Sequence, residues 1–136
     1  MEDCIFCKIV RREATGEIFY EDDHVVAFVN LHPVSKGHSL IIPKKHFKDL
    51  LETDDEVLSA IISTSKKICQ GVMDATGAAG FNLTVNTKAA AGQTVFHTHF
   101  HVIPRYDHDG LEMWPHSETE PKTRAEMAEE FKKFIK

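Results

Sequence analysis

Three histidines, His97, His99 and His101, recur at every second position of the segment 97–103, which reads His-Thr-His-Phe-His-Val-Ile. Alternate side chains of a β-strand point to the same face, so an extended segment places these imidazoles together, about 6.5–7 Å apart along the backbone. Imidazole is uncharged near neutral pH and serves as a nucleophile, a hydrogen-bonding group or a metal ligand. The spacing therefore predicts a site that surrounds one phosphate group or one metal ion.

The loop before these histidines is rich in small residues and carries polar side chains. Gly92 allows a ligand to approach the backbone closely, and Gln93 and Thr94 offer neutral hydrogen-bonding groups, as does Asn86 at the start of the loop. Alone, these residues are typical of an ordinary surface loop. Their position next to the three histidines makes them candidates for ligand contacts.

A Cys-x-x-Cys pair, Cys4 and Cys7, lies near the N-terminus. It supplies two of the four ligands of a zinc site, and His46 with one histidine of the 97–101 group would complete a Cys2His2 set. The alternative is a thioredoxin-like redox motif, which follows a strand in a βαβ unit, whereas this pair precedes the first expected strand. Zinc is the favoured interpretation, and Cys69 is expected to be a small buried residue.

These residues must be positioned by strands that precede and follow one long helix in the sequence. Short apolar runs bounded by turn residues predict strands at 17–20, 25–29 and 38–42, and alternation predicts two more at 81–85 and 96–103. A capping box at Thr53 and Glu56 and apolar residues at helical spacing predict a helix from Thr53 to Met73, ended by Gly77 and Gly80. The fold class is therefore α+β, an antiparallel five-stranded sheet with helices packed on it.

A last amphipathic helix is expected to begin between 119 and 121 and to present Met127, Phe131, Phe134 and Ile135 on one face. We expect residues 1–110 to form one domain. Residues 111–136 form a C-terminal extension whose helix packs on that same domain.

Composition excludes several classes of function. The chain has 136 residues, 42% of them hydrophobic, which is enough for one unaided core. Its net charge of −5 argues against a broad nucleic-acid surface, and no segment contains the eighteen apolar residues that cross a bilayer. Three cysteines are too few for a disulfide framework, and the acidic N-terminus lacks the features of a signal peptide. We expect a protein of the reducing cytoplasm, with no membrane or nucleic-acid partner.

These motifs, in this order, resemble the histidine triad (HIT) superfamily, and most closely its small bacterial zinc-containing hydrolases. The resemblance rests on the segment 97–103, on 4–10, on Gly37-His38, on 42–44 and on 103–105. It implies the five-stranded HIT-like fold and a homodimer, joined through the long helix and the adjoining strand, in which the sheet continues across the interface.

The resemblance also implies a chemistry, cleavage at the α-phosphate of a purine nucleotide such as a dinucleoside polyphosphate or a nucleoside phosphoramidate. His99 would form a covalent nucleotidyl-histidine, supported by His101 and His38. By the same matching, Asn86, Gln93 and Thr94 contact the phosphate or the leaving group, and Asn30 faces the ribose. The implied base pocket consists of Phe6, Ile9, Phe28 and Leu31. The implied ligands of a structural zinc ion are Cys4, Cys7, His46 and His97.

Three other interpretations remain. A nucleotide sensor would keep the pocket without the reaction, although it has little need of a nucleophile. A hydrolase with a catalytic metal held by the three histidines would keep an open coordination position. RNA binding finds no basic or aromatic platform in the sequence. The four remaining histidines outside these motifs are expected to be solvated: His24, His32, His108 and His116.

Overall fold

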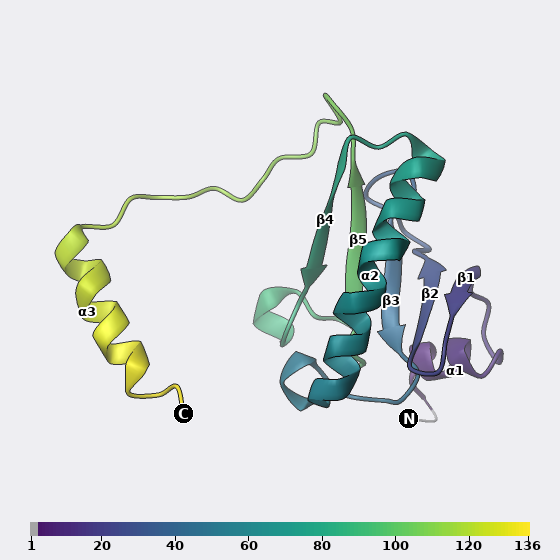
Figure 1. The fold of residues 1–136 in the computed structure, drawn as a ribbon, viewed down its shortest axis with the longest axis horizontal. Coiled ribbons are helices and arrows are strands. Elements are labelled where there is room, and N and C mark those ends of the chain that lie inside the picture. The colour runs from purple at the N-terminus through teal and green to yellow at the C-terminus, as the bar shows by residue number, and fades with distance from the viewer. Residues whose placement is uncertain (1–2) are drawn as a thin grey trace.

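Residues 3–136 are described by the structure, a computed structural model, and their strands form one antiparallel sheet in the order β1-β2-β3-β5-β4 (Figure 1). The strands are β1 (Ile18–Glu21), β2 (Val25–Val29), β3 (Ser39–Pro43), β4 (Gly80–Val85) and β5 (Phe100–Arg105). The helices are α1 (Ile5–Val10), α2 (Asp55–Thr76) and α3 (Pro121–Lys132), with short 3₁₀ turns η1 (Leu50–Glu52) and η2 (Ala89–Ala91). The predicted α+β class and five-stranded antiparallel sheet are confirmed.

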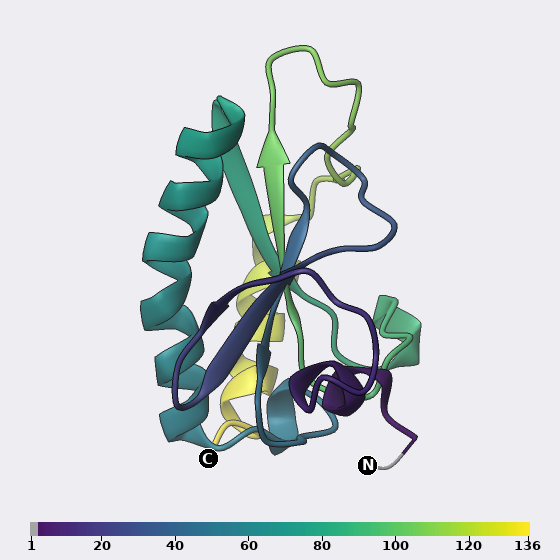
Figure 2. The ribbon, with the colours of Figure 1, turned by 90° about the vertical axis from the view of Figure 1, so that its right-hand side faces the viewer.

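The sheet is covered on both faces, by α2 on one side and by α1 on the other (Figure 2). Because side chains alternate along a strand, β2 contributes to both cores. Val25 and Ala27 join the α2 residues Ile61, Ile68 and Cys69 on one face. On the other face, α1 packs against the residues of β2 and β3 that point the opposite way, in a cluster of Phe6, Ile9, Val26, Phe28, Leu40 and Ile42. This second core forms the wall on which the histidines lie.

The long helix begins differently from the prediction. The Thr53–Glu56 capping box is wrong, because Asp54 precedes α2 and makes no side-chain cap. The Thr53 hydroxyl donates instead to the carbonyl of Asp49 at 2.7 Å and is hydrogen-bonded to the Thr98 hydroxyl. The Thr53 hydroxyl, which was expected to cap α2, therefore bonds across the turn η1 directly before the helix. At the other end Gly77, with φ +74°, confirms the predicted stop.

The histidine segment also differs from the predicted strand 96–103, because β5 begins only at Phe100. The backbone N–H of Thr98 donates to the carbonyl of Phe47 instead of pairing with a strand. The ring nitrogen Nε2 of His97 lies 2.9 Å from the carbonyl of Pro43, the last residue of β3. A side chain therefore takes the place of a backbone partner here, and only His101 of the three histidines lies in regular strand.

The C-terminal helix forms as predicted but does not pack on its own domain. None of the α3 side chains is buried, and Phe131 is 58% exposed. Figure 1 shows an extended segment that carries α3 away from the sheet, beyond β4. The structure therefore does not show the packing of α3 on the domain of residues 1–110 that the sequence analysis expects. No helix within residues 3–136 is long and apolar enough to cross a membrane.

Gly37 offers a test of how tightly the sheet is joined to α2. Its φ is +91°, and a Cβ there would lie 2.9 Å from Cγ2 of Thr76. We expect Gly37→Ala to lower the free energy of unfolding by about 2 kcal/mol, from backbone strain and crowding together. Gly71→Ala is the matched control, since nothing lies within 4 Å of its Cβ, and it should stabilise α2 slightly. Urea denaturation measures both; equal effects would contradict the argument.

Candidate active site and metal-ligand cluster

A pocket of about 610 Å³ opens beside His99 and His101. Its apolar wall includes Phe6, whose ring centroid lies 5.6 Å from that of Phe28 and 5.1 Å from that of His99. The structure brings to this pocket eight of the residues that were proposed for catalysis or nucleotide contacts: Phe6, Ile9, Phe28, Asn30, Leu31, Thr94, His99 and His101. An apolar cleft with a few polar groups at one end is the usual form of a small-molecule site.

His99 is held in one tautomer. Its Nδ1 lies 2.8 Å from the carbonyl oxygen of His97. Because a carbonyl only accepts, Nδ1 must carry the proton, and Nε2 of the neutral ring keeps its lone pair. Burial lowers the pKa of His99, partly offset by this hydrogen bond. The ring is therefore neutral at physiological pH, with Nε2 available as a nucleophile.

His38 and His101 form a hydrogen-bonded pair beside the pocket. The backbone N–H of Val34 donates to Nδ1 of His38 at 3.1 Å, so the proton of the neutral His38 ring lies on Nε2. That nitrogen is 3.0 Å from Nδ1 of His101 and donates to it. Neutral His101 consequently carries its own proton on Nε2. Burial lowers the pKa of His38, and burial together with the neighbouring His99 and His38 lowers the pKa of His101 to about 4.

Asn30 lies between the pocket and this histidine pair. Its Oδ1 accepts from the backbone N–H of His32, and its Nδ2 lies 3.2 Å from Nε2 of His38; because both of these nitrogens carry protons, this is a contact and not a hydrogen bond. His32 was expected to be solvated; it is exposed, and it also lines the pocket. Asn30 thus contacts His38 and also lines the pocket.

Gln93 is placed to support the loop and does not line the pocket. Its Oε1 accepts from the N–H of Lys88 at 2.8 Å, and its Nε2 donates to the carbonyls of Lys48 and Val95. The side chain is buried. Asn86 is likewise outside the pocket wall, beside Gly92, where a Cβ would lie 3.4 Å from its Nδ2. The structure therefore gives the loop an internal frame, and Thr94 is the loop side chain proposed for phosphate that reaches the pocket.

This placement predicts a large loss of stability on mutation of Gln93 and almost none on mutation of its neighbour Thr94. Gln93→Ala leaves the Lys88 N–H and two carbonyls without their partners, and should lower the free energy of unfolding by about 2–4 kcal/mol. Thr94→Val changes an exposed side chain and should leave stability within about 0.5 kcal/mol of the unmutated protein. Chemical denaturation of both variants checks this. A stable Gln93→Ala protein would show that the loop does not depend on the buried amide.

The four proposed metal ligands lie together. The Sγ and ring nitrogen atoms of Cys4, Cys7, His46 and His97 are all within 4.8 Å of one another. His97 Nδ1 lies 3.4 Å from Cys4 Sγ and 3.5 Å from Cys7 Sγ, and His46 Nδ1 lies 3.4 Å from Cys7 Sγ. Tetrahedral zinc at ordinary bond lengths sets sulfur and nitrogen ligands about 3.5 Å apart. The donor set and its spacing therefore fit a four-coordinate zinc ion.

The ring of His97 is oriented for this role. Its Nε2 donates to the carbonyl of Pro43, so Nδ1 keeps the lone pair that a metal requires. Burial lowers the pKa of His97 to about 4, which keeps the ring neutral, and also lowers the pKa of His46. The three histidines His97, His99 and His101 do not form a metal-ligand group among residues 3–136, where the group found is the Cys2His2 set.

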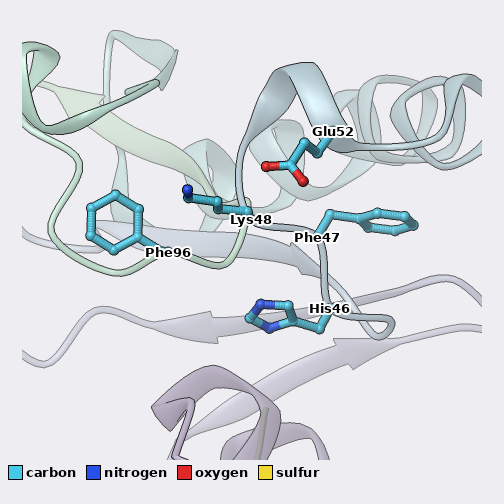
Figure 3. Close-up of a pocket in the computed structure, with 5 residues that line it drawn as sticks. All are labelled: His46, Phe47, Lys48, Glu52 and Phe96. Atoms are coloured by element: carbon cyan, nitrogen blue, oxygen red, sulfur yellow. The ribbon is translucent and has the colours of Figure 1, made fainter.

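A second hollow, of about 670 Å³, adjoins His46. Figure 3 shows its lining side chains, with the rings of Phe47 and Phe96 on opposite sides and Lys48 and Glu52 between them. The two opposite charges give this hollow no net charge that would attract a phosphate. It shares no lining residue with the histidine pocket.

Part of the pocket was missed by the sequence analysis. The turn of Thr15, Gly16 and Glu17 lines it although nothing in its sequence pattern indicates a site. Gly16 lies against α1, since a Cβ there would be 2.8 Å from Cγ2 of Ile9. The backbone N–H of Val34, which fixes the tautomer of His38, belongs to a loop and has no sequence signature either.

Comparison with known proteins gives a consistent result. The HIT domain family model matches residues 11–108. Adenylylsulfatase HINT3 of Arabidopsis thaliana is 49% identical over 109 residues, which are 80% of this chain and 55% of that protein, so this chain spans only about half of that relative's length. The crystal structure of SMU.412c from Streptococcus mutans has a TM-score of 0.94 at 36% identity, with 100% of this chain and 87% of that chain covered. A Zn-bound histidine triad family protein from Mycobacterium smegmatis has a TM-score of 0.79 at 32% identity, with 96% and 97% covered. Because the family model matches most of its length, this chain belongs to the HIT domain family.

Proposed function

We propose that this protein cleaves nucleotides at the α-phosphate through a covalent nucleotidyl-histidine on His99. The observation that carries the proposal is the tautomer of His99, whose Nδ1–H is donated to a carbonyl while Nε2 is left as a nucleophile in a pocket. Membership of the HIT family and a relative named adenylylsulfatase support a nucleotide hydrolase.

The reaction takes two displacements. Nε2 of His99 attacks the α-phosphorus, and the bond from phosphorus to the leaving group breaks; the departing atom keeps the electron pair of that bond, accepts a hydrogen bond from Nε2–H of His101 and takes its proton from water. A water molecule then attacks the same phosphorus and loses a proton to the solvent, and the N–P bond breaks with its electron pair returning to Nε2 of His99, which releases the nucleoside monophosphate. His38 holds His101 in the required tautomer throughout. Splitting one difficult displacement into two easier ones is the advantage of the covalent route.

The substrate is a purine nucleotide with a leaving group on its α-phosphate, such as a dinucleoside polyphosphate or a nucleoside phosphoramidate. We assign the base to the apolar wall formed by Phe6, Ile9, Phe28 and Leu31 and the ribose to Asn30. Thr94 contacts the phosphate. Asn86 and Gln93, proposed as contacts from the resemblance, act through the loop that carries Thr94.

Zinc is the proposed cofactor, held by Cys4, Cys7, His46 and His97. Four protein ligands leave no open coordination position, so the bound ion supplies structural stability and takes no part in the reaction. It ties the N-terminal segment with α1 to the histidine segment. Phe6 of α1, whose ring centroid lies 5.8 Å from that of His97, is thereby held in the pocket wall.

A homodimer completes the proposal. β4 is the last strand of the sheet and pairs with β5 on one side only. Phe81 on this strand and Ile62 on α2 are 42% and 49% exposed, which leaves apolar surface for a second copy. Pairing of two β4 edges would continue the sheet across the interface.

Intact-protein mass spectrometry tests the reaction. Adenosine phosphoramidate mixed with the protein and quenched in the pre-steady state should add one adenylyl group to the chain, and peptide mapping should place it on His99. Release of AMP should accompany it. Binding of AMP with neither adduct nor turnover would instead identify a nucleotide sensor.

The pH dependence follows from the buried histidines. A lowered pKa means that His99 and His101 stay neutral when the pH falls below 6.5, the ordinary value for histidine. Activity should therefore persist below the pH at which an ordinary histidine becomes protonated, and fall only as protonation of His99 removes the nucleophilic lone pair. Rates of adduct formation in single-turnover experiments give the profile. A midpoint at or above pH 6.5 would show that burial does not control this group.

A further inference from the structure

The C-terminal helix carries an apolar face that no other part of residues 3–136 covers. Met127 and Phe131 lie on one side of α3, and Phe134 and Ile135 continue that side in the turn after it; all four are exposed. No buried residue occurs anywhere between 111 and 136. Side chains of this size pack against something when they line one face of a helix, since burial of each contributes favourable free energy.

The base of this segment is fixed. The guanidinium of Arg105, at the end of β5, contacts both carboxylate oxygens of Asp109 and donates to the carbonyl of Leu111. Asp109 also accepts from the backbone N–H groups of Tyr106 and Leu111. The Tyr106 hydroxyl donates to the carbonyl of Lys36 at 2.6 Å, which anchors the turn to the domain. These hydrogen bonds fix the turn, and the turn sets the direction in which residues 111–136 leave the sheet.

That direction leads past the open edge of the sheet. Figure 1 places α3 on the side of β4, the strand with no outer neighbour, and Figure 2 shows α3 behind the sheet when it is viewed from the β1 side. Residues 111–120 are extended and span up to about 33 Å, whereas a five-stranded sheet is about 19 Å wide. The solved Streptococcus mutans protein matches the whole chain at a TM-score of 0.94, so the same placement occurs in a crystal structure.

We infer that residues 111–136 are an exchanged arm, whose apolar face is covered by the body of a second copy of this chain. The inference rests on the dimer of the proposed function. A copy paired at the β4 edge lies on the side toward which the arm extends, and two-fold symmetry gives each copy the other's arm. The arm thereby supplies an interface separate from the strand edge, and the dimer is held at two places.

Photo-crosslinking distinguishes an exchanged arm from one that folds back or stays free. A benzoylphenylalanine at position 131, in full-length protein at low micromolar concentration, should yield a covalent dimer of twice the 15.4 kDa chain mass under denaturing conditions. Mapped crosslinks should join α3 to residues 3–110 of the other chain. Products of monomer mass only, crosslinks between two α3 helices only, or no crosslink at all would each overturn the inference.

Two matched variants give a second measurement. Phe131→Asp places a charge on the apolar face and should raise the dimer dissociation constant by about 10- to 100-fold. Ala125→Asp adds the same charge on the opposite side of α3 and should leave it unchanged. Sedimentation velocity measures both. Equal dissociation constants for the two variants would overturn the exchanged arm, and a His99 adduct that persists in such a case would show that the reaction stands without it.

Discussion

Replacement of His99 by asparagine or glycine should abolish both the covalent adduct and turnover, with a loss in kcat/KM on the order of 10⁴-fold or more. The reason lies in the tautomer fixed by the His97 carbonyl, which leaves Nε2 as the only atom of this side chain that can attack phosphorus. Asparagine can still accept or donate hydrogen bonds but forms no stable phosphoryl linkage. The pocket should survive, because its wall is built by Phe6 and Phe28.

The measurement is a steady-state assay with adenosine phosphoramidate, together with AMP affinity by calorimetry. His116→Asn is the matched control, since His116 is exposed in the linker to α3 and should leave kcat/KM unchanged. His101→Asn should form the adduct slowly, because the leaving group then departs without the hydrogen bond from Nε2–H of His101. A His99→Asn protein that still turned over would contradict covalent catalysis and favour direct attack by water.

Removal of zinc should lower the melting temperature by roughly 10–20 °C, because binding to a site formed only in the folded state adds several kcal/mol to the free energy of unfolding. The four ligands come from the N-terminal end of α1, the loop after β3 and the segment before β5, so the ion would link three separate parts of the chain. Burial raises the pKa of the Cys7 thiol, so without the ion this sulfur would stay protonated and neutral. A neutral thiol at this position would contribute little to the free energy of unfolding.

Differential scanning calorimetry with and without a strong chelator measures this effect, with metal content determined by elemental analysis. Cys7→Ser should lose the ion and melt at the temperature of the chelated protein. Cys69→Ala is the matched control: it removes a buried thiol of α2, whose pKa burial raises to about 11, and should cost about 1 kcal/mol while the chelator effect persists. A melting temperature that is the same with and without the chelator would contradict a structural metal.

The periodic elements could be predicted from the sequence because one face of each is buried. Val25–Val29 is a strand at the predicted residues, and Gly77 ends α2 as expected. The capping box was wrong because the Thr53 hydroxyl bonds to Asp49 and Thr98, the second of which is distant in the sequence. No local pattern reports such a competition between a helix terminus and a tertiary contact.

At the candidate site, residue types predicted which side chains are involved but not the hydrogen bonds that they form. The sequence placed Gln93 near phosphate because it is polar and close to the histidines, yet its amide is consumed by Lys48 and Val95. The tautomers of His38 and His99 depend on the backbone atoms of Val34 and His97, which are the same in every sequence. The same limit applies to α3: an amphipathic face indicates that a helix packs against something, but not against what.

His97 serves two neighbours with two different parts of itself. Its ring is directed at the cysteines, while its main-chain oxygen orients His99. The first function can be exchanged by mutation and the second cannot, since every amino acid has that oxygen. Metal binding and the orientation of His99 can therefore be separated by design. Apolar residues could replace the four metal ligands, provided that they pack well enough to keep the backbone of residues 97–99 in place. The His97 carbonyl would then still hold Nδ1 of His99 and leave its Nε2 in the same orientation without a metal.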